Sequence, residues 1–159
     1  MFVLIVGVGR VGSTLARAML REGHEVSCLD EDPESHARLE VGMEEAWEEA
    51  GGRFTVGTAL EIDALEAAGI DQADAFVAAT DGDNTNIVIA QIAKRRYNVP
   101  KVIARILDPL RADWYDRQGV HTICPTKVAI EMLEREVRAA AAEHGGPQPA
   151  TVEGGGPAE

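Results

Sequence analysis

The most constraining feature of this sequence is its N-terminal stretch FVLIVGVGRVG, residues Phe2 to Gly12. Five consecutive apolar residues, Phe2 to Val6, predict a strand buried on both faces, as in a parallel sheet. Gly7, Gly9 and Gly12 follow at once in the pattern G-x-G-x-x-G, and an amphipathic helix pattern then opens. The stretch therefore predicts a strand, a glycine turn and a helix, the unit that begins many nucleotide-binding α/β folds.

Each glycine has a physical reason in such a unit. Gly7 turns the chain sharply out of the strand, Gly9 lets a pyrophosphate approach the backbone, and Gly12 lets the helix pack closely on the sheet. The free N–H groups at the start of the helix would face the phosphates. A second apolar run, residues 26–29, ends in Asp30, whose carboxylate can hold both ribose hydroxyls and would repel the 2′-phosphate of NADP. The alternative is that the glycines serve packing alone.

Charge and hydropathy limit the partners. The chain has 159 residues, a length that suits one domain, and a formal net charge of -12. That charge argues against nucleic acid and anionic lipid, so an anionic nucleotide must be held by backbone N–H groups and a few cations such as Arg10. No apolar run approaches the roughly 20 residues of a membrane span. We expect a cytoplasmic protein that does not insert into the membrane.

The two cysteines, Cys28 and Cys124, fall on the second and sixth predicted strands. In the strand order given below, these strands are four spacings apart, roughly 19 Å. A disulfide needs Cα atoms within about 7 Å, so we expect no intrachain bridge, in agreement with a reducing compartment. Without a cluster of Cys and His residues, we also expect no metal site.

Strand patterns alternate with helix patterns six times along the chain. The strands are expected at 2–6, 25–29, 53–56, 75–78, 102–105 and 121–124, with later helices at 33–50, 60–68, 84–97, 109–117 and 125–143. This alternation predicts an α/β fold, a Rossmann-like doubly wound parallel six-stranded sheet in the order 3-2-1-4-5-6 with a C-terminal helix. We expect residues 1–143 to form one domain and residues 144–159, rich in Gly, Pro, Ala and Glu, to form a disordered tail.

Ligands on open α/β sheets bind where the strand order reverses, beside the first and fourth strands. The loop after the fourth strand offers small residues and polar ones. Thr80 and Asn84 either bind the ligand or cap the next helix, and the same alternative holds for Glu31 after the second strand. The predicted cofactor-binding residues are Gly7, Gly9, Arg10, Val11, Gly12, Asp30, Glu31, Thr58, Ala59, Ala79, Thr80, Asp81, Asn84 and Arg105.

Two helices predict self-association. The helix at 84–97 carries Ile87, Ile89 and Ile92 with hardly any polar side in its middle, so it has more apolar surface than one sheet contact needs. The helix at 125–143 follows the last strand and has no further sheet of its own to cover. We therefore expect a homodimer or a larger ring.

The spacing of residues in the sequence does not pair any histidine with a catalytic partner, so we predict no catalytic residue. The Rossmann-like unit uses nearly the whole chain, which leaves no room for a substrate domain. A nucleotide-sensing module is therefore favoured over the alternative, a small NAD-dependent oxidoreductase or the cofactor-binding half of one.

Five stretches carry a family resemblance: GVGRVG (7–12), LDEDP (29–33), EAAGIDQADAFVAATDGDNTN (66–86), KVIARILDP (101–109) and GVHTICPT (119–126). They resemble the N-terminal domain of the RCK family, the regulators of K⁺ conductance, also called TrkA-N or KTN. The likeness spans about residues 1–133.

The resemblance implies a cytoplasmic gating subunit at the inner face of the membrane, which couples NAD(H) or ATP/ADP to a membrane-embedded K⁺ transporter or channel subunit. It also implies that Arg10 contacts phosphate, that Asp30 binds ribose, and that the 80–84 loop borders the ligand. The sequence departs from the family at Thr58, where an acidic residue is usual. The family's second lobe is not expected either, because only the tail follows the long helix.

Overall fold

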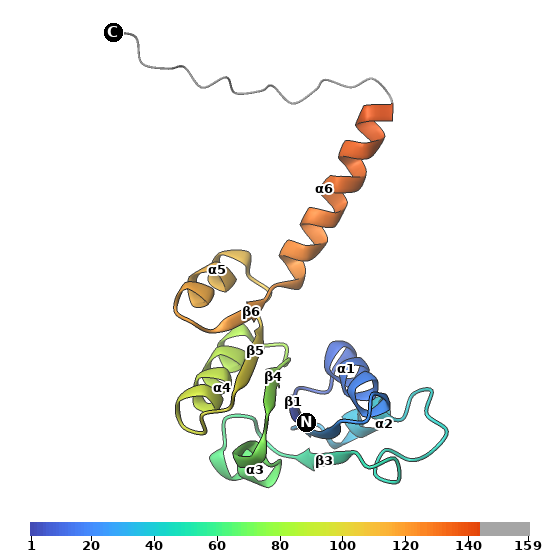
Figure 1. Cartoon of the computed structure of the whole chain (residues 1–159), viewed down its shortest axis with the longest axis vertical. Coiled ribbons are helices and arrows are strands. Elements are labelled where there is room, and N and C mark those ends of the chain that lie inside the picture. The colour runs from blue at the N-terminus through green and yellow to red at the C-terminus, as the bar shows by residue number, and fades with distance from the viewer. Residues whose placement is uncertain (144–159) are drawn as a thin grey trace. The chain divides into compact units, whose positions relative to one another are not determined.

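The computed structural model describes residues 1–143 and shows a six-stranded, all-parallel sheet in the order β3-β2-β1-β4-β5-β6 (Figure 1). The strands are β1 Phe2–Val6, β2 Glu25–Asp30, β3 Arg53–Val56, β4 Ala75–Ala78, β5 Lys101–Arg105 and β6 His121–Ile123. The helices are α1 Arg10–Arg21, α2 His36–Leu39, α3 Ile62–Ala67, α4 Asp83–Arg95, α5 Pro109–Arg117 and α6 Pro125–Glu143, with short 3-10 helices at η1 Pro33–Ser35 and η2 Ile70–Gln72. The predicted fold class and strand order are confirmed, and the predicted tail lies outside the described residues.

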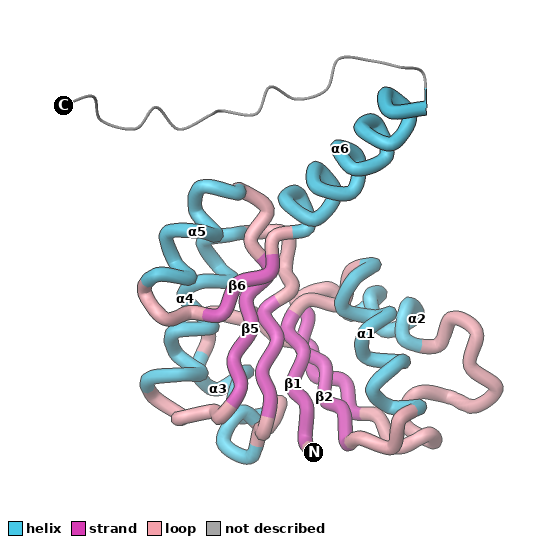
Figure 2. The backbone as a smooth tube through the Cα atoms, turned by 45° about the horizontal axis from the view of Figure 1, so that its top comes forward, coloured by secondary structure: helices cyan, strands magenta, loops and turns pink. Residues whose placement is uncertain are grey.

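Helices cover the two faces of this sheet: α1 and α2 lie on one side, α3, α4 and α5 on the other (Figure 2). Alternate residues of β1 therefore enter two separate cores. Leu4 and Val6 pack into the α3–α5 core, whereas Val3 and Ile5 pack into the α1–α2 core. This double burial explains why β1 reads as an uninterrupted apolar run.

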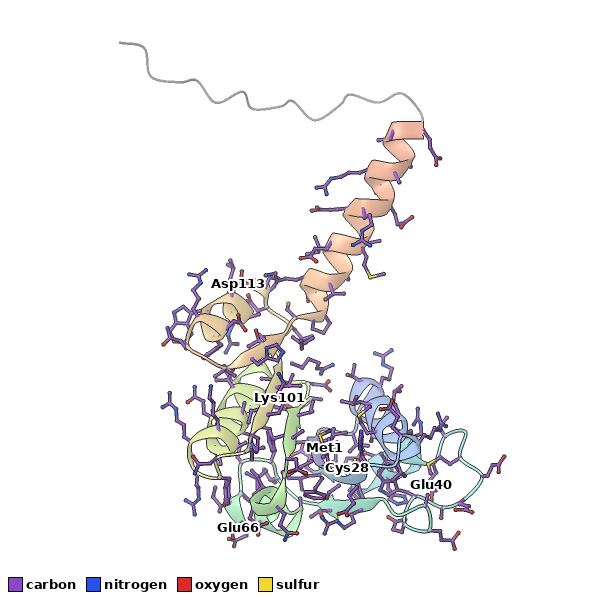
Figure 3. The ribbon with its side chains drawn as sticks, in the orientation of Figure 1. Met1, Cys28, Glu40, Glu66, Lys101 and Asp113 are labelled. Carbon is purple, nitrogen blue, oxygen red and sulfur yellow. The ribbon has the colours of Figure 1, made fainter. Side chains whose placement is uncertain are left out.

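Both cysteines are free, and both are buried. Cys28 lies on β2 and is fully buried (Figure 3). Burial, and then the nearby Asp30 carboxylate, raise the pKa of Cys28 to about 12. A thiol with this pKa stays protonated at neutral pH and is a poor nucleophile.

The predicted helix at 33–50 is wrong, because helical structure ends at Leu39 and a loop of turns runs on to β3. Gly42 and Gly51 both adopt positive φ angles, 74° and 94°, which stop a helix. Trp47 is fully buried between these turns. A Cβ atom on Gly52 would lie 2.2 Å from its indole ring, so the loop closes over Trp47 only because residue 52 is glycine.

Self-association was predicted from the many apolar residues of α4, but Ile89 lies in the chain's own core and cannot contribute to it. Ile87, Ile89, Ala90 and Ala93 are buried in the chain's own core, and Ile89 is 0% exposed. Val88 is the large apolar residue that α4 exposes among those described. Helix α4 packs on β4 and β5, and its buried residues belong to the same core cluster as Ala112 of α5.

Chain contacts divide the protein into residues 1–125 and a second unit that starts at Thr126, so α6 is described by itself. None of its residues is buried, and its exposed apolar side chains are Val128, Ile130, Met132, Leu133 and Val137. Within the described residues, no helix combines the length and hydropathy that a membrane span requires.

Candidate functional site

A cavity of about 470 Å³ opens at the carboxyl edge of the sheet, where β1 and β4 lie side by side. Three loops line it: the glycine turn after β1, the acidic segment after β2, and the loop after β4, together with residues 57–60 after β3. Parallel strands bring all these loops to one edge, which is the topological switch point at which α/β sheets bind ligands.

The glycine turn forms one wall of the cavity. Gly7 has a φ of 95°, and a Cβ there would lie 2.6 Å from the backbone nitrogen of Thr80. A Cβ on Gly12 would lie 1.9 Å from the carbonyl oxygen of Gly7. Gly9, by contrast, has no heavy atom within 4 Å of its Cβ position and no side chain caps α1 there. The first N–H groups of α1 are thus available to an anion at Gly9.

Asp30 lies at the end of β2 and lines the cavity. Its Oδ2 accepts a hydrogen bond from the N–H of Val8 (2.6 Å) and its Oδ1 accepts one from the N–H of Asp32 (2.9 Å). Each carboxylate oxygen retains acceptor capacity, so a pair of ribose hydroxyls can donate to it. The two backbone bonds hold the carboxylate in place between the glycine turn and the acidic loop.

Thr80 is tied to Asn86, a side chain that is 1% exposed. Asn86 Oδ1 accepts from the N–H (3.0 Å) and the hydroxyl (2.6 Å) of Thr80, while its Nδ2 donates to the carbonyls of Thr80 (2.9 Å) and Arg105 (2.8 Å). The hydroxyl of Thr80 also accepts from the N–H of Gly82 (3.3 Å), so both the hydroxyl and the N–H of Thr80 are engaged by the protein.

Arg105 lies behind this loop and does not line the cavity. Its Nη2 donates to the carbonyl oxygen of Thr80 (2.8 Å) and to Oδ1 of Asp81 (3.0 Å). Asn84 also lies off the cavity, and its Oδ1 accepts a hydrogen bond from Arg111. Arg105 therefore supports the loop after β4 that lines the cavity, whereas Asn84 is bonded to α5.

The structure brings nine of the fourteen predicted residues to the cavity and leaves five outside its lining. Those that line it are Gly7, Gly9, Asp30, Glu31, Thr58, Ala59, Ala79, Thr80 and Asp81; those that do not are Arg10, Val11, Gly12, Asn84 and Arg105. Arg10 and Val11 are exposed in the first turn of α1, and Gly12 is buried under it. The direct ligand roles of all fourteen stay predictions.

Sequence reasoning missed Arg38 and Asn86. Arg38 lines the cavity from α2, and its Nη1 donates to the carbonyl oxygen of Val8 at 3.3 Å. It was missed because it fell in the middle of the helix that was wrongly predicted at 33–50. Asn86 was missed because a polar residue near the start of a helix such as α4 is common. Its burial depends on β5 and the loop after β4, which are distant in sequence and cannot be inferred from a local pattern.

Outside the cavity, His36, Glu40 and Glu48 bring one ligand atom each to within 4.8 Å of one another. Nε2 of His36 lies 2.8 Å from a carboxylate oxygen of Glu48, and the backbone N–H of Trp47 donates to Glu40 (3.3 Å). Glu40 lies beside α2 in Figure 3. These hydrogen bonds attach the 40–52 loop to α2.

Residues 3–126 match the family model described as TrkA-N domain. A Trk system potassium uptake protein TrkA from Streptomyces coelicolor is 39% identical over 143 residues, which cover 90% of this chain and 61% of that relative. The chain thus spans less than two thirds of the relative's length.

Solved structures show the same fold. The Kef CTD of Shewanella denitrificans in AMP-bound form has a TM-score of 0.70 and 28% identity over 88% of this chain and 81% of that one. The GsuK channel bound to NAD also has a TM-score of 0.70, with 20% identity over 89% of this chain and 24% of that one.

Proposed function

The chain belongs to the TrkA-N domain family, and from this we propose that it is a nucleotide-binding regulatory part of a K⁺ uptake system. The observation that carries the proposal is the cavity in which the glycine turn, Asp30 and the Thr80 loop meet. NAD(H), ATP and ADP share an adenosine and a diphosphate, which this arrangement suits: N–H groups of α1 for the phosphates and a carboxylate for the ribose.

Regulation rather than catalysis suits the chemistry of the cavity. Cys28 is buried in the core and does not line the cavity, and the hydroxyl of Thr80 already donates to Asn86. Neither group is set up as a nucleophile or a base. We assign the site to nucleotide sensing, and its output to a membrane-embedded K⁺ transporter or channel subunit at the cytoplasmic side of the membrane.

Asp30→Asn tests the ribose contact. The variant should bind ADP and NAD about 10- to 100-fold more weakly, because a hydrogen bond to a charged group contributes about 1.5–3 kcal/mol. Calorimetry with AMP, ADP, ATP and NAD on the full chain measures this. Asp71→Asn, an exposed acid in η2 away from the cavity, is the matched control and should bind normally. Failure of the wild-type chain to bind any of the four nucleotides would end the proposal.

The exposed stripe of α6 supports self-association. Ile130, Leu133 and Val137 are spaced i, i+3 and i+7, and Leu133 is 66% exposed. Because isolated helices of this length are marginal in water, the stripe calls for a partner surface. A second copy of the chain offers the same stripe in a two-fold arrangement.

Leu133→Asp should convert an oligomeric protein to monomer, since it places a charge in an apolar contact. Size-exclusion chromatography with light scattering reports the mass, and circular dichroism checks that the fold persists. Arg135→Asp adds the same acid two residues along, about 200° around the helix from Leu133, and should leave the mass unchanged. A wild-type chain that stays monomeric at high concentration, with and without nucleotide, contradicts the oligomer.

A further inference from the structure

The charge of the cavity lining is unusual for an anion site. Among the described residues that line it, four are acidic, Asp30, Glu31, Asp32 and Asp81, and one is basic, Arg38. The N–H groups of α1 can hold phosphate without a cation. The guanidinium of Arg38 is therefore available to contact another part of the nucleotide, and its position in the cavity indicates which part.

Arg38 is anchored on the ribose side of the glycine turn. The N–H of Val8 donates to Asp30 and the carbonyl of Val8 accepts from Arg38, so both side chains contact the backbone of one residue. Asp30 marks the place of the ribose. In an adenine nucleotide the base is attached to the ribose on the side away from the phosphates, which directs it from Asp30 toward the 57–60 loop and the wall formed by α2.

The guanidinium of Arg38 is held by one weak bond. Its Nη1 to Val8 oxygen distance is 3.3 Å, while its own carbonyl oxygen accepts from Arg17 and Leu39 beside it is fully buried. The backbone of α2 is therefore held in place, whereas the Arg38 side chain is exposed and lines the cavity. A guanidinium is planar and stacks well on aromatic rings.

Apart from the acidic segment 30–32 after β2, the remaining lining at this end is uncharged. Thr58, Ala59 and Leu60 follow β3, and Leu29 lies in β2. These uncharged residues can accept the flat face of a purine, but none of them offers a cation to hold it.

We propose that Arg38 is a specificity-determining residue that stacks on the adenine base of the bound nucleotide, at the mouth of the cavity between α2 and the 57–60 loop. This inference rests on the proposed nucleotide function. It assigns the base, and not the phosphates, to the one basic residue that lines the cavity in the described part of the chain. The negative charge of Asp30 would repel a 2′-phosphate on the ribose, so Arg38 is not expected to bind a phosphate there.

The test compares how affinity changes along the series AMP, ADP and ATP. Arg38→Ala should weaken binding of all three by a similar factor, about 5- to 30-fold, because the base is common to them. Arg10→Ala should instead weaken binding more as phosphates are added, since Arg10 lies in the first turn of α1. Arg21→Ala removes another exposed arginine that bonds the neighbouring loop, at Gly42, and should bind as wild type.

Arg38→Lys separates stacking from a structural role. Lysine keeps the charge and can still donate to Val8, but it has no plane to stack, so affinity should stay clearly below wild type. Full recovery in Arg38→Lys, no loss in Arg38→Ala, or a loss that grows from AMP to ATP would each overturn the inference. If the wild-type chain binds none of these nucleotides, the proposed function fails as well, whereas normal wild-type binding with any of those three results defeats only the role of Arg38.

Discussion

Gly12→Ala should destabilise the fold by about 3 kcal/mol, whereas Gly9→Ala should cost less than about 1 kcal/mol and weaken nucleotide binding instead. The substitutions are chemically identical and three residues apart. At Gly12 the new Cβ would lie 1.9 Å from the carbonyl oxygen of Gly7 and 3.0 Å from its carbonyl carbon. At Gly9 it would meet no heavy atom within 4 Å.

The clash at Gly12 has no easy relief because the opposing atom is backbone. Gly7 is held by its own N–H, which donates to the carbonyl of Leu29 at 2.9 Å, and its φ of 95° leaves little freedom. Helix α1 would have to move away from β1, which breaks its packing in the α1–α2 core. The methyl group of Gly9→Ala points instead to open space, where a phosphate would approach the backbone.

Urea unfolding measures the first effect and nucleotide calorimetry the second. Gly23→Ala is an unsuitable control, because a side chain at its φ of 82° would be strained. Ala18→Gly, at a half-buried site in α1, instead measures the effect of an ordinary exchange between alanine and glycine. Equal stability losses at Gly12 and Gly9 would contradict the assignment of packing to one glycine and ligand access to the other.

The close packing at Gly12 was predictable from the sequence, since the motif fixes the order of its glycines, whereas ligand approach at Gly9 stays a prediction. The strand order was predictable for the same reason: strands that alternate with helices have right-handed crossovers, which leave few arrangements. Asp30 could be placed because it ends an apolar run. Each of these inferences depends on local pattern and chain direction alone.

The loop from Glu40 to Gly52 was not predictable in this way. Its sequence is rich in good helix formers, and a helix was the expected result. The structure instead buries Trp47 against Gly52, a contact between residues five apart that no periodicity reports. Arg38 was missed as a consequence, because its place at the cavity depends on where α2 ends.

The excess of apolar residues on α4 also misled the sequence reasoning. Periodicity shows that a face is apolar, but it does not show whether the chain's own core or another copy covers it. Ile89 is in the core of this chain, so Ile89→Asp would test folding and say nothing about assembly. Leu133 on α6 is the position that tests assembly.

Asn86→Leu should lower the free energy of unfolding by about 3 kcal/mol and weaken nucleotide binding. Leucine fills a similar volume, so the loss comes from hydrogen bonds. Without the amide, the N–H and carbonyl of Thr80 and the carbonyl of Arg105 lose their Asn86 bonds in a buried place, and each unpaired buried group costs about 1–3 kcal/mol. The carbonyl of Thr80 keeps its bond from Arg105, which limits the total.

The ligand effect follows from the same bonds, because Asn86 fixes the loop that forms one wall of the cavity. Asn84→Ala is the matched control for stability alone: the same residue type two positions earlier in α4, but exposed, and expected to cost less than about 0.5 kcal/mol.

Asn86→Asp separates acceptor from donor, since aspartate can still accept from Thr80 but places a carboxylate against the carbonyls of Thr80 and Arg105. It should be at least as unstable as Asn86→Leu near neutral pH and should recover as the carboxyl protonates, because the protonated form can donate to one of those carbonyls. Unfolding curves at neutral and acid pH measure this, and an Asn86→Asp chain as stable as wild type at neutral pH would show that the two donated bonds contribute nothing to holding the loop.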